Sequence, residues 1–516
     1  MPWAVVAAAL LAIGVVYARA RWPGYLPIGS DNDEYQLAGR ALAAFEAPLI
    51  AGTEGTKYPL GYPALLAALE WLGLPVAPTA LALNLVAVAV TVGLLSHLAG
   101  RATSTSPASP GAALATGAVI ATSVSVWNDV YSVMPEMALL VTVAAMLTTL
   151  QQPLVGRPLV TFVVLAVIAV LFKTLAILLL IGGCGLVWLF AHRRGGLVND
   201  GPEPPADPMI RTRALLPAGA ALVTALAGLV AGRSLPEHTT GYVATFALED
   251  PFDASLGSLG PLGLLRRSVA DVPATFTDLG RAIALIDAGT TVAVLVAILG
   301  LTVGVVAAHR LRPGAPLGIF TAGAALAYAL GMTTWPFHSS RFGIPLVPIA
   351  ALGAGWLVRL ATDHLATPRQ GAGADVDGVR QRWASLAAGG VVAALLIATS
   401  FGAVVDRGEA GADRLATQHA AMERLESFVA QELNDERLVS FDYREVAHRL
   451  DRPVEPLSYT TDTSALLDQV GDAEVVVMVD INARRNRQLR MLLEAYPDRF
   501  VPLFEEPDVA VYRIVP

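Results

Sequence analysis

The sequence predicts a polytopic α-helical membrane protein of about eleven transmembrane helices with a small C-terminal α/β soluble domain. Three observations predict this fold class. Hydrophobic residues make up 54% of the chain and charged residues only 15%, whereas soluble domains carry roughly 25% charge. The apolar residues gather in segments of about 20 residues, the length that crosses a bilayer as a helix. After about residue 410 charge returns, and short apolar runs alternate with amphipathic segments.

Eleven segments are apolar enough and long enough to be transmembrane helices. They cover residues 2–20, 78–98, 111–128, 132–150, 157–173, 174–192, 213–232, 288–308, 316–334, 343–362 and 384–405. The stretch 59–76 is also apolar, but it is short and interrupted by proline, so we expect an interfacial helix lying along the membrane. If it crossed the membrane instead, every later helix would reverse its orientation.

The distribution of arginine predicts which side of the membrane each loop occupies. With the N-terminus in the cytoplasm, the short arginine-rich loops, such as 192–194 and 309–312, all fall on the cytoplasmic side. The outer side then receives loops 21–77 and 233–287. We therefore expect a transmembrane domain over residues 1–405 and an extracytoplasmic α/β domain over 406–516, in a multi-pass protein of the cytoplasmic (inner) membrane.

The C-terminal segment alternates between expected strands and expected helices. Strands are predicted at 438–441, 473–479 and 509–515, with helices near 444–450 and 482–495, which indicates a small α/β layer. No glycine-rich dinucleotide fingerprint follows any of these strands, so we expect a scaffold or a cap on the acceptor side. The chain also lacks a basic patch of the kind that binds nucleic acid.

Acidic residues gather in the first loop of the predicted outer side. Asp31, Asp33 and Glu34 lie within four residues, and their mutual repulsion raises at least one pKa unless a cation or hydrogen-bond donors offset it. A carboxylate in such a setting could accept a proton from a hydroxyl group of an acceptor. The alternatives are a solvated acidic loop and a loop that binds a divalent cation, and the sequence leaves metal dependence open.

Lysine is rare in this chain. Only two of the 35 basic residues are lysine, Lys57 and Lys173, and the others are arginine. Each lysine is therefore a hint that its position needs a compact point charge. Lys57 follows the acidic segment closely. For Lys173, near the outer end of the fifth span, we expect that the side chain extends to the membrane surface.

The first outer loop resembles the signature of the GT-C superfamily of membrane glycosyltransferases. It is most similar to the branch that contains protein O-mannosyltransferases and aminoarabinose transferases. In that family an acidic motif is followed by Tyr, a small residue and Arg, and the matching residues here are Asp31, Tyr35, Gly39 and Arg40. By this spacing Asp31 is the better catalytic candidate and Asp33 is the second. Asn32 stands where the family often has Glu, so the match is incomplete.

Three further patches resemble the family. Lys57-Tyr58-Pro59-Leu60 is similar to a Lys-Pro-Pro-Leu element whose lysine neutralises the donor phosphate, with Tyr58 replacing the first Pro. Glu136 opens the fourth span, where relatives often carry Glu. Arg341 resembles a late arginine that could bind a phosphate by two hydrogen bonds, with His338 as a second donor. Anchoring at the membrane surface is the alternative role for Glu136, His338 and Arg341.

The resemblance implies transfer of a sugar, with inversion, from a polyprenyl-phosphate donor on the outer face of the membrane. Asp31 would be the base, and Lys57, Arg341 and His338 would bind the donor phosphate. The supporting residues would be Glu34, Tyr35, Arg40, Tyr58 and Glu136. No cofactor is implied beyond the open question of a divalent cation. The implied partners are the lipid-linked donor, the bilayer and a lipid, glycan or protein acceptor.

Three other functions stay open at this point. A lipid-linked glycan ligase or polymerase shares the donor chemistry and would rest on the long loop 233–287, which contains Arg266 and Arg267. A transporter would show inverted repeats and charges at mid-bilayer, and no repeat is seen. A membrane-anchored binding protein would use the C-terminal domain as its working part.

Overall fold

The computed structural model describes most of the chain. The described residues are 30–50, 54–55, 58–101, 108–193, 208–233, 248–250, 253–283, 290–311, 316–335, 337–365, 374–433, 435–457, 462–479, 483–506 and 508–515. The predicted first span at 2–20 and the predicted phosphate-binding residue Lys57 lie outside them.

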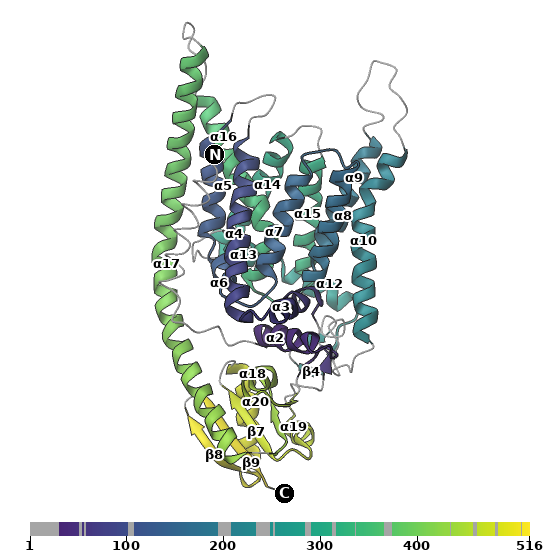
Figure 1. Cartoon of the computed structure of the whole chain (residues 1–516), viewed down its shortest axis with the longest axis vertical. Helices are drawn as coiled ribbons and strands as arrows, with labels where there is room; N and C mark the ends of the chain where they lie inside the picture. Colours follow the sequence, from purple (N-terminus) through teal and green to yellow (C-terminus); the bar gives the residue numbers. More distant parts are fainter. Residues whose placement is uncertain are drawn as a thin grey trace.

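Apolar helices run side by side in one bundle (Figure 1). Five described helical stretches are long and apolar enough to cross a membrane. They belong to α4 (Val76–Gly100), α14 (Thr290–Leu311), α15 (Pro316–Thr333), α16 (Val347–Leu365) and α17 (Ala374–Glu432). Shorter apolar helices accompany them: α5 (Pro110–Thr122), α7 (Glu136–Thr149), α8 (Arg157–Phe172), α9 (Ala176–Arg193) and α10 (Pro208–Arg233). The chain is thus a polytopic membrane protein, while the count of about eleven spans stays a prediction.

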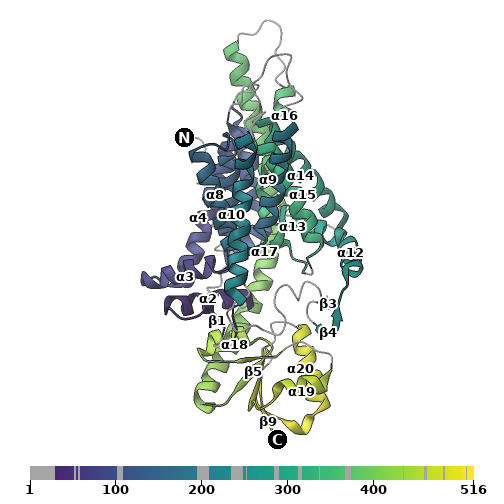
Figure 2. The ribbon, with the colours of Figure 1, turned by 90° about the vertical axis from the view of Figure 1, so that its right-hand side faces the viewer.

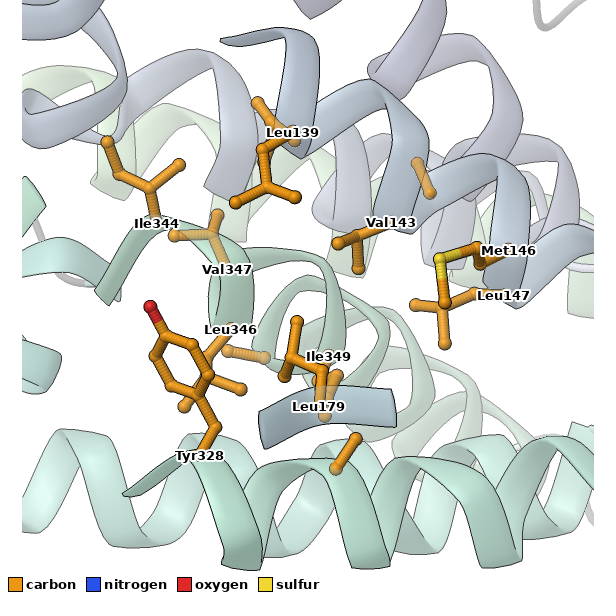
Figure 3. Close-up of a cluster of buried hydrophobic side chains, with 14 of the residues drawn as sticks. Leu139, Val143, Met146, Leu147, Leu179, Tyr328, Ile344, Leu346, Val347 and Ile349 are labelled. Carbon is orange, nitrogen blue, oxygen red and sulfur yellow. The ribbon is translucent and has the colours of Figure 1, made fainter. Parts of the chain in front are cut away.

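Small residues allow the helices of the bundle to approach closely. A Cβ atom on Gly182 of α9 would lie 2.3 Å from the carbonyl oxygen of Gly323 on α15. Lipid tails are as apolar as leucine, so helices in a membrane associate through such close packing rather than through the hydrophobic effect. Larger side chains fill the space between the helices, among them Leu139, Leu179 and Val347 (Figure 3). This packed bundle is the rigid support for the polar residues at its end.

Short helices cover one end of the bundle. Both α2 (Ser30–Ala43) and α3 (Gly61–Trp71) lie across that end, and α12 (Pro261–Ala270) lies on the opposite side from α3 (Figure 2). Eleven residues of α helix extend about 16 Å, well short of a bilayer core of about 30 Å. The arrangement fits the expected interfacial helix in 59–76. The end also contains α6 (Val124–Val130), α13 (Val272–Ile283) and the 3₁₀ helix η2 (Ser340–Leu346).

The acidic segment is a helix, and the expectation of an acidic loop was wrong. Asp31 and Asp33 lie in the first turn of α2, where negative side chains interact favourably with the helix dipole. The helix packs closely on α3, since a Cβ atom on Gly39 would lie 2.9 Å from the Cβ of Leu66. Two short antiparallel strand pairs complete this region, β1 (Leu49–Ile50) with β2 (Glu54–Gly55), and β3 (Leu248–Asp250) with β4 (Asp253–Ser258).

The C-terminal residues form a five-stranded mixed sheet with the order β6-β5-β7-β9-β8. The strands are β5 (Leu438–Ser440), β6 (Glu455–Pro456), β7 (Val475–Val479), β8 (Phe500–Glu506) and β9 (Val509–Ile514). Side chains of β7 alternate between the faces: Val475 and Val477 pack with α17 and α18 (Tyr443–Leu450). Val476 packs with α19 (Thr463–Val470) and α20 (Ala483–Ala495).

The long helix α17 connects the bundle to this sheet. It runs for 59 residues without interruption, so the predicted domain boundary at 405/406 falls inside one helix. One stretch of α17 lines the bundle, and a later stretch packs on the sheet through residues such as Leu425 and Val429. The sheet therefore lies beyond the end of the bundle that carries α2 and α3 (Figure 1).

Candidate active site

Helix α2 presents its acidic residues on two different faces. Because an α helix turns every 3.6 residues, Asp31 and Tyr35 share one face, while Asp33 and Leu37 share another. The first face is turned toward the bundle, where Tyr35 stacks on Tyr58 with ring centroids 4.7 Å apart. The second face is turned toward the C-terminal domain, whose apolar core is in contact with Leu37. The three carboxylates of the cluster therefore lie in different parts of the protein.

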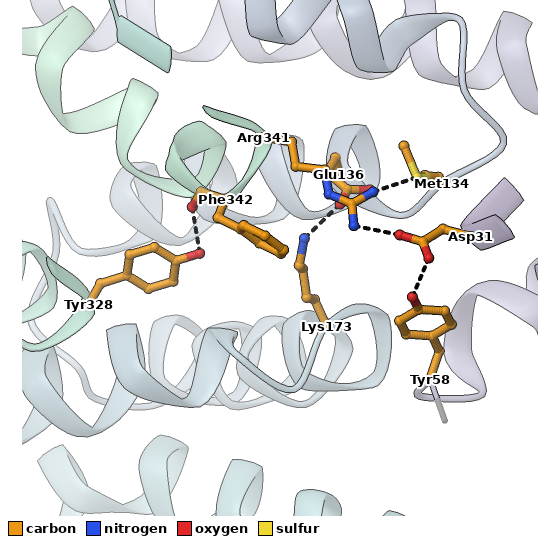
Figure 4. A network of polar contacts seen from close by, with 8 residues as sticks. All are labelled: Asp31, Tyr58, Met134, Glu136, Lys173, Tyr328, Arg341 and Phe342. Carbon is orange, nitrogen blue, oxygen red and sulfur yellow. Dashed lines mark hydrogen bonds and ion pairs between the residues drawn. The ribbon is translucent and has the colours of Figure 1, made fainter. Parts of the chain in front are cut away.

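Asp31 lies between an arginine and a tyrosine. The hydroxyl of Tyr58 donates a hydrogen bond of 2.5 Å to Asp31 Oδ1, and Arg341 Nη2 donates to Asp31 Oδ2 (Figure 4). Arg341 comes from η2, 310 residues further along the chain. Its guanidinium also packs on the ring of Phe342 at 5.0 Å. A cation and a donor hydroxyl beside Asp31 both favour the ionised carboxylate that a base requires.

A second ion pair lies next to the first. Lys173 Nζ is 2.6 Å from Glu136 Oε1, and it also lies 4.9 Å from the centroid of the Phe342 ring (Figure 4). The expectation that Lys173 extends to the membrane surface was wrong. The side chain of Glu136 is only 4% exposed, and a buried carboxylate needs a cation beside it, which Lys173 supplies. The rarity of lysine was the one signal in the sequence that pointed to Lys173.

A third carboxyl group, Asp129, belongs to this neighbourhood and was not predicted. It follows Asn128 near the end of α6 and is buried, and its Oδ2 has no hydrogen-bond partner among the described residues. Burial, and then the nearby carboxylate of Glu136, raise the pKa of Asp129 to about 8. At neutral pH this group therefore carries a proton.

We expect Asp129→Asn to make the protein's stability less dependent on pH. The folded protein holds the Asp129 proton more tightly than the unfolded chain, whose pKa is near 3.8, so stability falls as the pH rises from there to about 8. Asparagine resembles the protonated form and does not titrate. The thermal midpoint of the variant, relative to that of wild type, should therefore be higher at about pH 9 than at about pH 5. Glu70→Gln, at an exposed position, is the control. If the thermal midpoints of Asp129→Asn and wild type differed by the same amount at both pH values, the prediction would be contradicted.

The other two carboxylates of α2 pair with the C-terminal domain. His448 Nδ1 lies 2.5 Å from Asp33 Oδ1, and Arg444 Nε lies 3.0 Å from Glu34 Oε2. Both basic residues are on α18, and neither was predicted, because nothing in the sequence links 444–448 to residues 31–34. Arg40 also faces this domain, with its Nη1 3.5 Å from Asp451 Oδ1. Each carboxylate of the cluster thus has a separate basic residue beside it.

No group of three or more His, Cys, Asp or Glu side chains in the described part of the chain is arranged to hold a metal ion. Each acidic residue of α2 instead lies beside an arginine or a histidine.

His338 lies in a separate small pocket. Its ring nitrogens are 3.8 Å from Asp271 Oδ2 and 3.6 Å from Asp278 Oδ2, and Thr275 and Phe342 are among the other residues that line the pocket. Burial raises the pKa of Asp278.

Arg266 and Arg267 of loop 233–287 are not among the residues that line this pocket. Arg266 and Arg267 lie on α12, and Arg267 Nη2 donates to the carbonyl oxygen of Thr334 at 3.4 Å.

The structure therefore brings some of the predicted site residues together and separates others. Asp31, Tyr35, Tyr58, Glu136 and Arg341 gather at the end of the bundle, joined by Lys173 and Asp129. The residues that lie apart from this group are Asp33, Glu34 and Arg40, which face the C-terminal domain, and His338, which faces α13. Lys57 is outside the described residues.

Comparison with solved structures identifies the fold. The crystal structure of ArnT from Cupriavidus metallidurans bound to undecaprenyl phosphate matches with a TM-score of 0.59 at 14% sequence identity. The match covers 99% of this chain and 97% of ArnT. This chain has the GT-C fold. The similarity extends over nearly the whole length of both chains, so it includes the bundle and the C-terminal domain alike.

A second GT-C structure supports the assignment. The archaeal oligosaccharyltransferase AglB from Archaeoglobus fulgidus, in complex with an inhibitory peptide and a dolichol-phosphate, matches with a TM-score of 0.52 at 10% identity. This match covers 96% of the chain and 72% of AglB. No protein-family model and no curated protein sequence matches the chain. At 10–14% identity, the similarity over the whole chain is recognised from the structure, while the sequence shows it only in short motifs.

Proposed function

We propose that this protein is an inverting glycosyltransferase that takes its sugar from a polyprenyl-phosphate donor. The reaction occurs on the outer face of the cytoplasmic membrane, and the acceptor is a lipid, a glycan or a protein. One observation carries the proposal. Asp31 lies between Arg341 and Tyr58 at the end of an apolar bundle, with the cation of Lys173 close by.

Asp31 is the proposed catalytic base. It accepts the proton of the acceptor hydroxyl as the acceptor oxygen attacks the anomeric carbon and the bond to the donor phosphate breaks. The leaving group is already a phosphate, so the main demands on the protein are to orient the two substrates and to stabilise the growing charge. Asp31 has a side chain that is partly exposed, which leaves it accessible to an acceptor.

Arg341, Lys173 and Lys57 are the proposed cations for the donor phosphate. Arg341 offers a planar fork that suits two phosphate oxygens, and the lysines supply point charges. In the structure, Arg341 is paired with Asp31 and Lys173 with Glu136. A phosphate that draws Arg341 toward itself weakens the pairing of Asp31. Donor binding in this way leaves a stronger base for the acceptor.

The solved structures support the class of donor. The ArnT structure contains undecaprenyl phosphate and the AglB structure contains a dolichol-phosphate, and both of these are polyprenyl phosphates. A long polyprenyl chain requires an apolar surface, and a catalyst that lies in the bilayer offers one.

The test is a transfer assay on the purified full-length protein in lipid nanodiscs. The donors are undecaprenyl-phosphate mannose and undecaprenyl-phosphate aminoarabinose, each with a radiolabelled sugar, and the acceptors are cell-envelope extracts. We expect label to move from the donor lipid into the extract, with release of undecaprenyl phosphate. If neither sugar moves and the protein does not bind undecaprenyl phosphate, the proposal is wrong.

We expect Lys57→Ala to weaken binding of the donor lipid roughly 10- to 100-fold while the thermal midpoint changes little. Loss of one charge-assisted contact to a phosphate removes about 1.5–3 kcal/mol when the group is well placed. Binding of undecaprenyl phosphate to protein in nanodiscs measures the effect. An affinity equal to that of wild type would remove Lys57 from the phosphate site.

A further inference from the structure

The C-terminal domain contacts the catalytic helix through buried charged residues. Arg444 Nε and Glu34 Oε2 are 3.0 Å apart, and the Glu34 side chain is fully buried while that of Arg444 is 13% exposed. His448 Nδ1 and Asp33 Oδ1 are 2.5 Å apart and are also largely buried. Surface ion pairs contribute little to stability, but removing one partner of a buried pair leaves a charge without compensation. The junction between α2 and α18 is therefore sensitive to each of its four residues.

Apolar packing makes this junction part of the domain core. Leu37, one turn beyond Asp33 on the same face of α2, packs against the cluster that contains Val446 of α18 and Val477 of the sheet. The guanidinium of Arg444 also packs on the ring of Tyr443 at 4.6 Å. Burial lowers the pKa of Arg444, while Glu34 and other neighbouring side chains together raise it above its ordinary value, so the guanidinium stays charged. Charged contacts and apolar packing together therefore hold α2 against the C-terminal domain.

The position of this junction matters because Asp31 lies on the same short helix. Asp31 is two residues from Asp33 and three from Glu34, and all three side chains are fixed by one short helix. A small rotation of α2 about its axis would carry Asp31 away from Arg341 and Tyr58. A displacement of about 1 Å at a reacting group can lower turnover by about 10²-fold.

We propose that Arg444 and His448 are positioning residues for the catalytic base. Arg444 pairs with Glu34 and His448 contacts Asp33, and these two contacts fix the rotation of α2, so that Asp31 alone of the three carboxylates faces the reaction site. The C-terminal domain is then an integral part of the active site rather than a cap or scaffold. This inference rests on the proposed role of Asp31 in sugar transfer.

The experiment compares Glu34→Gln, Arg444→Gln and the double variant in the full-length protein. Each single variant should lower kcat roughly 10- to 100-fold with a change of less than about threefold in the affinity for undecaprenyl phosphate. The double variant should be no slower than the slower single variant, because residues in one contact act as a unit. Arg444→Lys keeps the charge and should recover part of the lost kcat. His448→Gln, which removes the other pair, should also lower kcat.

The matched control is Arg437→Gln. Arg437 forms an exposed ion pair with Glu455 at 2.6 Å in the same domain and is not part of the junction with α2, so its loss should leave kcat unchanged. Hydrogen exchange supplies a readout that does not depend on the reaction. In Arg444→Gln, the amides of residues 31–40 should exchange faster, while those of α14, α15 and α16 keep their wild-type rates.

Three results would overturn the inference. The first is wild-type kcat in both Arg444→Gln and His448→Gln. The second is a loss of kcat that comes with faster exchange throughout the bundle, since the role would then be folding alone. The third is an exchange rate in 31–40 that does not change in either variant. If wild type transfers no sugar, the proposed function fails, and the exchange data still decide whether these residues hold α2.

Discussion

Asp31→Asn is expected to lower the rate of sugar transfer by about 10³-fold. Asparagine has nearly the same shape as aspartate and can still interact with Tyr58, but it cannot take a proton from the acceptor, and a positioned general base contributes roughly 10²–10⁴-fold. The change also removes the negative partner of Arg341, so binding of undecaprenyl phosphate should stay at least as strong as in wild type. Initial rates of label transfer and equilibrium lipid binding, measured on the same preparations, separate the two effects.

Glu70→Gln is the matched control for this prediction. Glu70 is an exposed carboxylate on α3, close to the same end of the bundle, and its loss should leave the rate unchanged. The thermal midpoint of Asp31→Asn should show that the variant is folded. Transfer at the wild-type rate in Asp31→Asn would move the base to Asp33 or Glu136.

Arg341→Gln is expected to lower kcat by about 10²–10³-fold and to weaken binding of the donor lipid. Loss of one fixed donor to a developing negative charge has an effect of this size in other enzymes. In this variant Asp31 loses its contact with Arg341 and keeps its hydrogen bond from Tyr58. Arg341→Lys keeps the charge without the planar fork and should recover only part of the rate.

The exposed Arg281 of α13 offers the control, and Arg281→Gln should transfer sugar at the wild-type rate. Lys173→Met tests the second cation of the site. We expect it to lose less kcat than Arg341→Gln, because the lysine ammonium cannot form the two parallel hydrogen bonds of a guanidinium. Unaltered donor affinity and unaltered kcat in Arg341→Gln would show that Arg341 only supports the fold. The proposed function would then lose its main source of charge stabilisation.

Much of the fold follows from local patterns in the sequence. The predicted spans at 78–98, 157–173 and 316–334 coincide closely with α4, α8 and α15, because a bilayer demands apolar segments of a set length. The predicted strand at 473–479 contains β7, and the helix near 444–450 is α18. Neighbouring residues alone decide such features. Whether the acidic segment is a loop or a helix was not decided locally, since α2 depends on its packing against α3.

For the site, the sequence by itself brought Asp31, Tyr58 and Arg341 into one hypothesis through short motifs. Only the tertiary structure decided which charged residues share a contact. Lys173 meets Glu136 from 37 residues away, and His448 meets Asp33 from 415 residues away. His338 lies near Arg341 in the sequence but faces Asp278 instead. The physical reason is that motif spacing determines the face of one helix, whereas pairing of charges depends on how separate helices and the C-terminal sheet pack together.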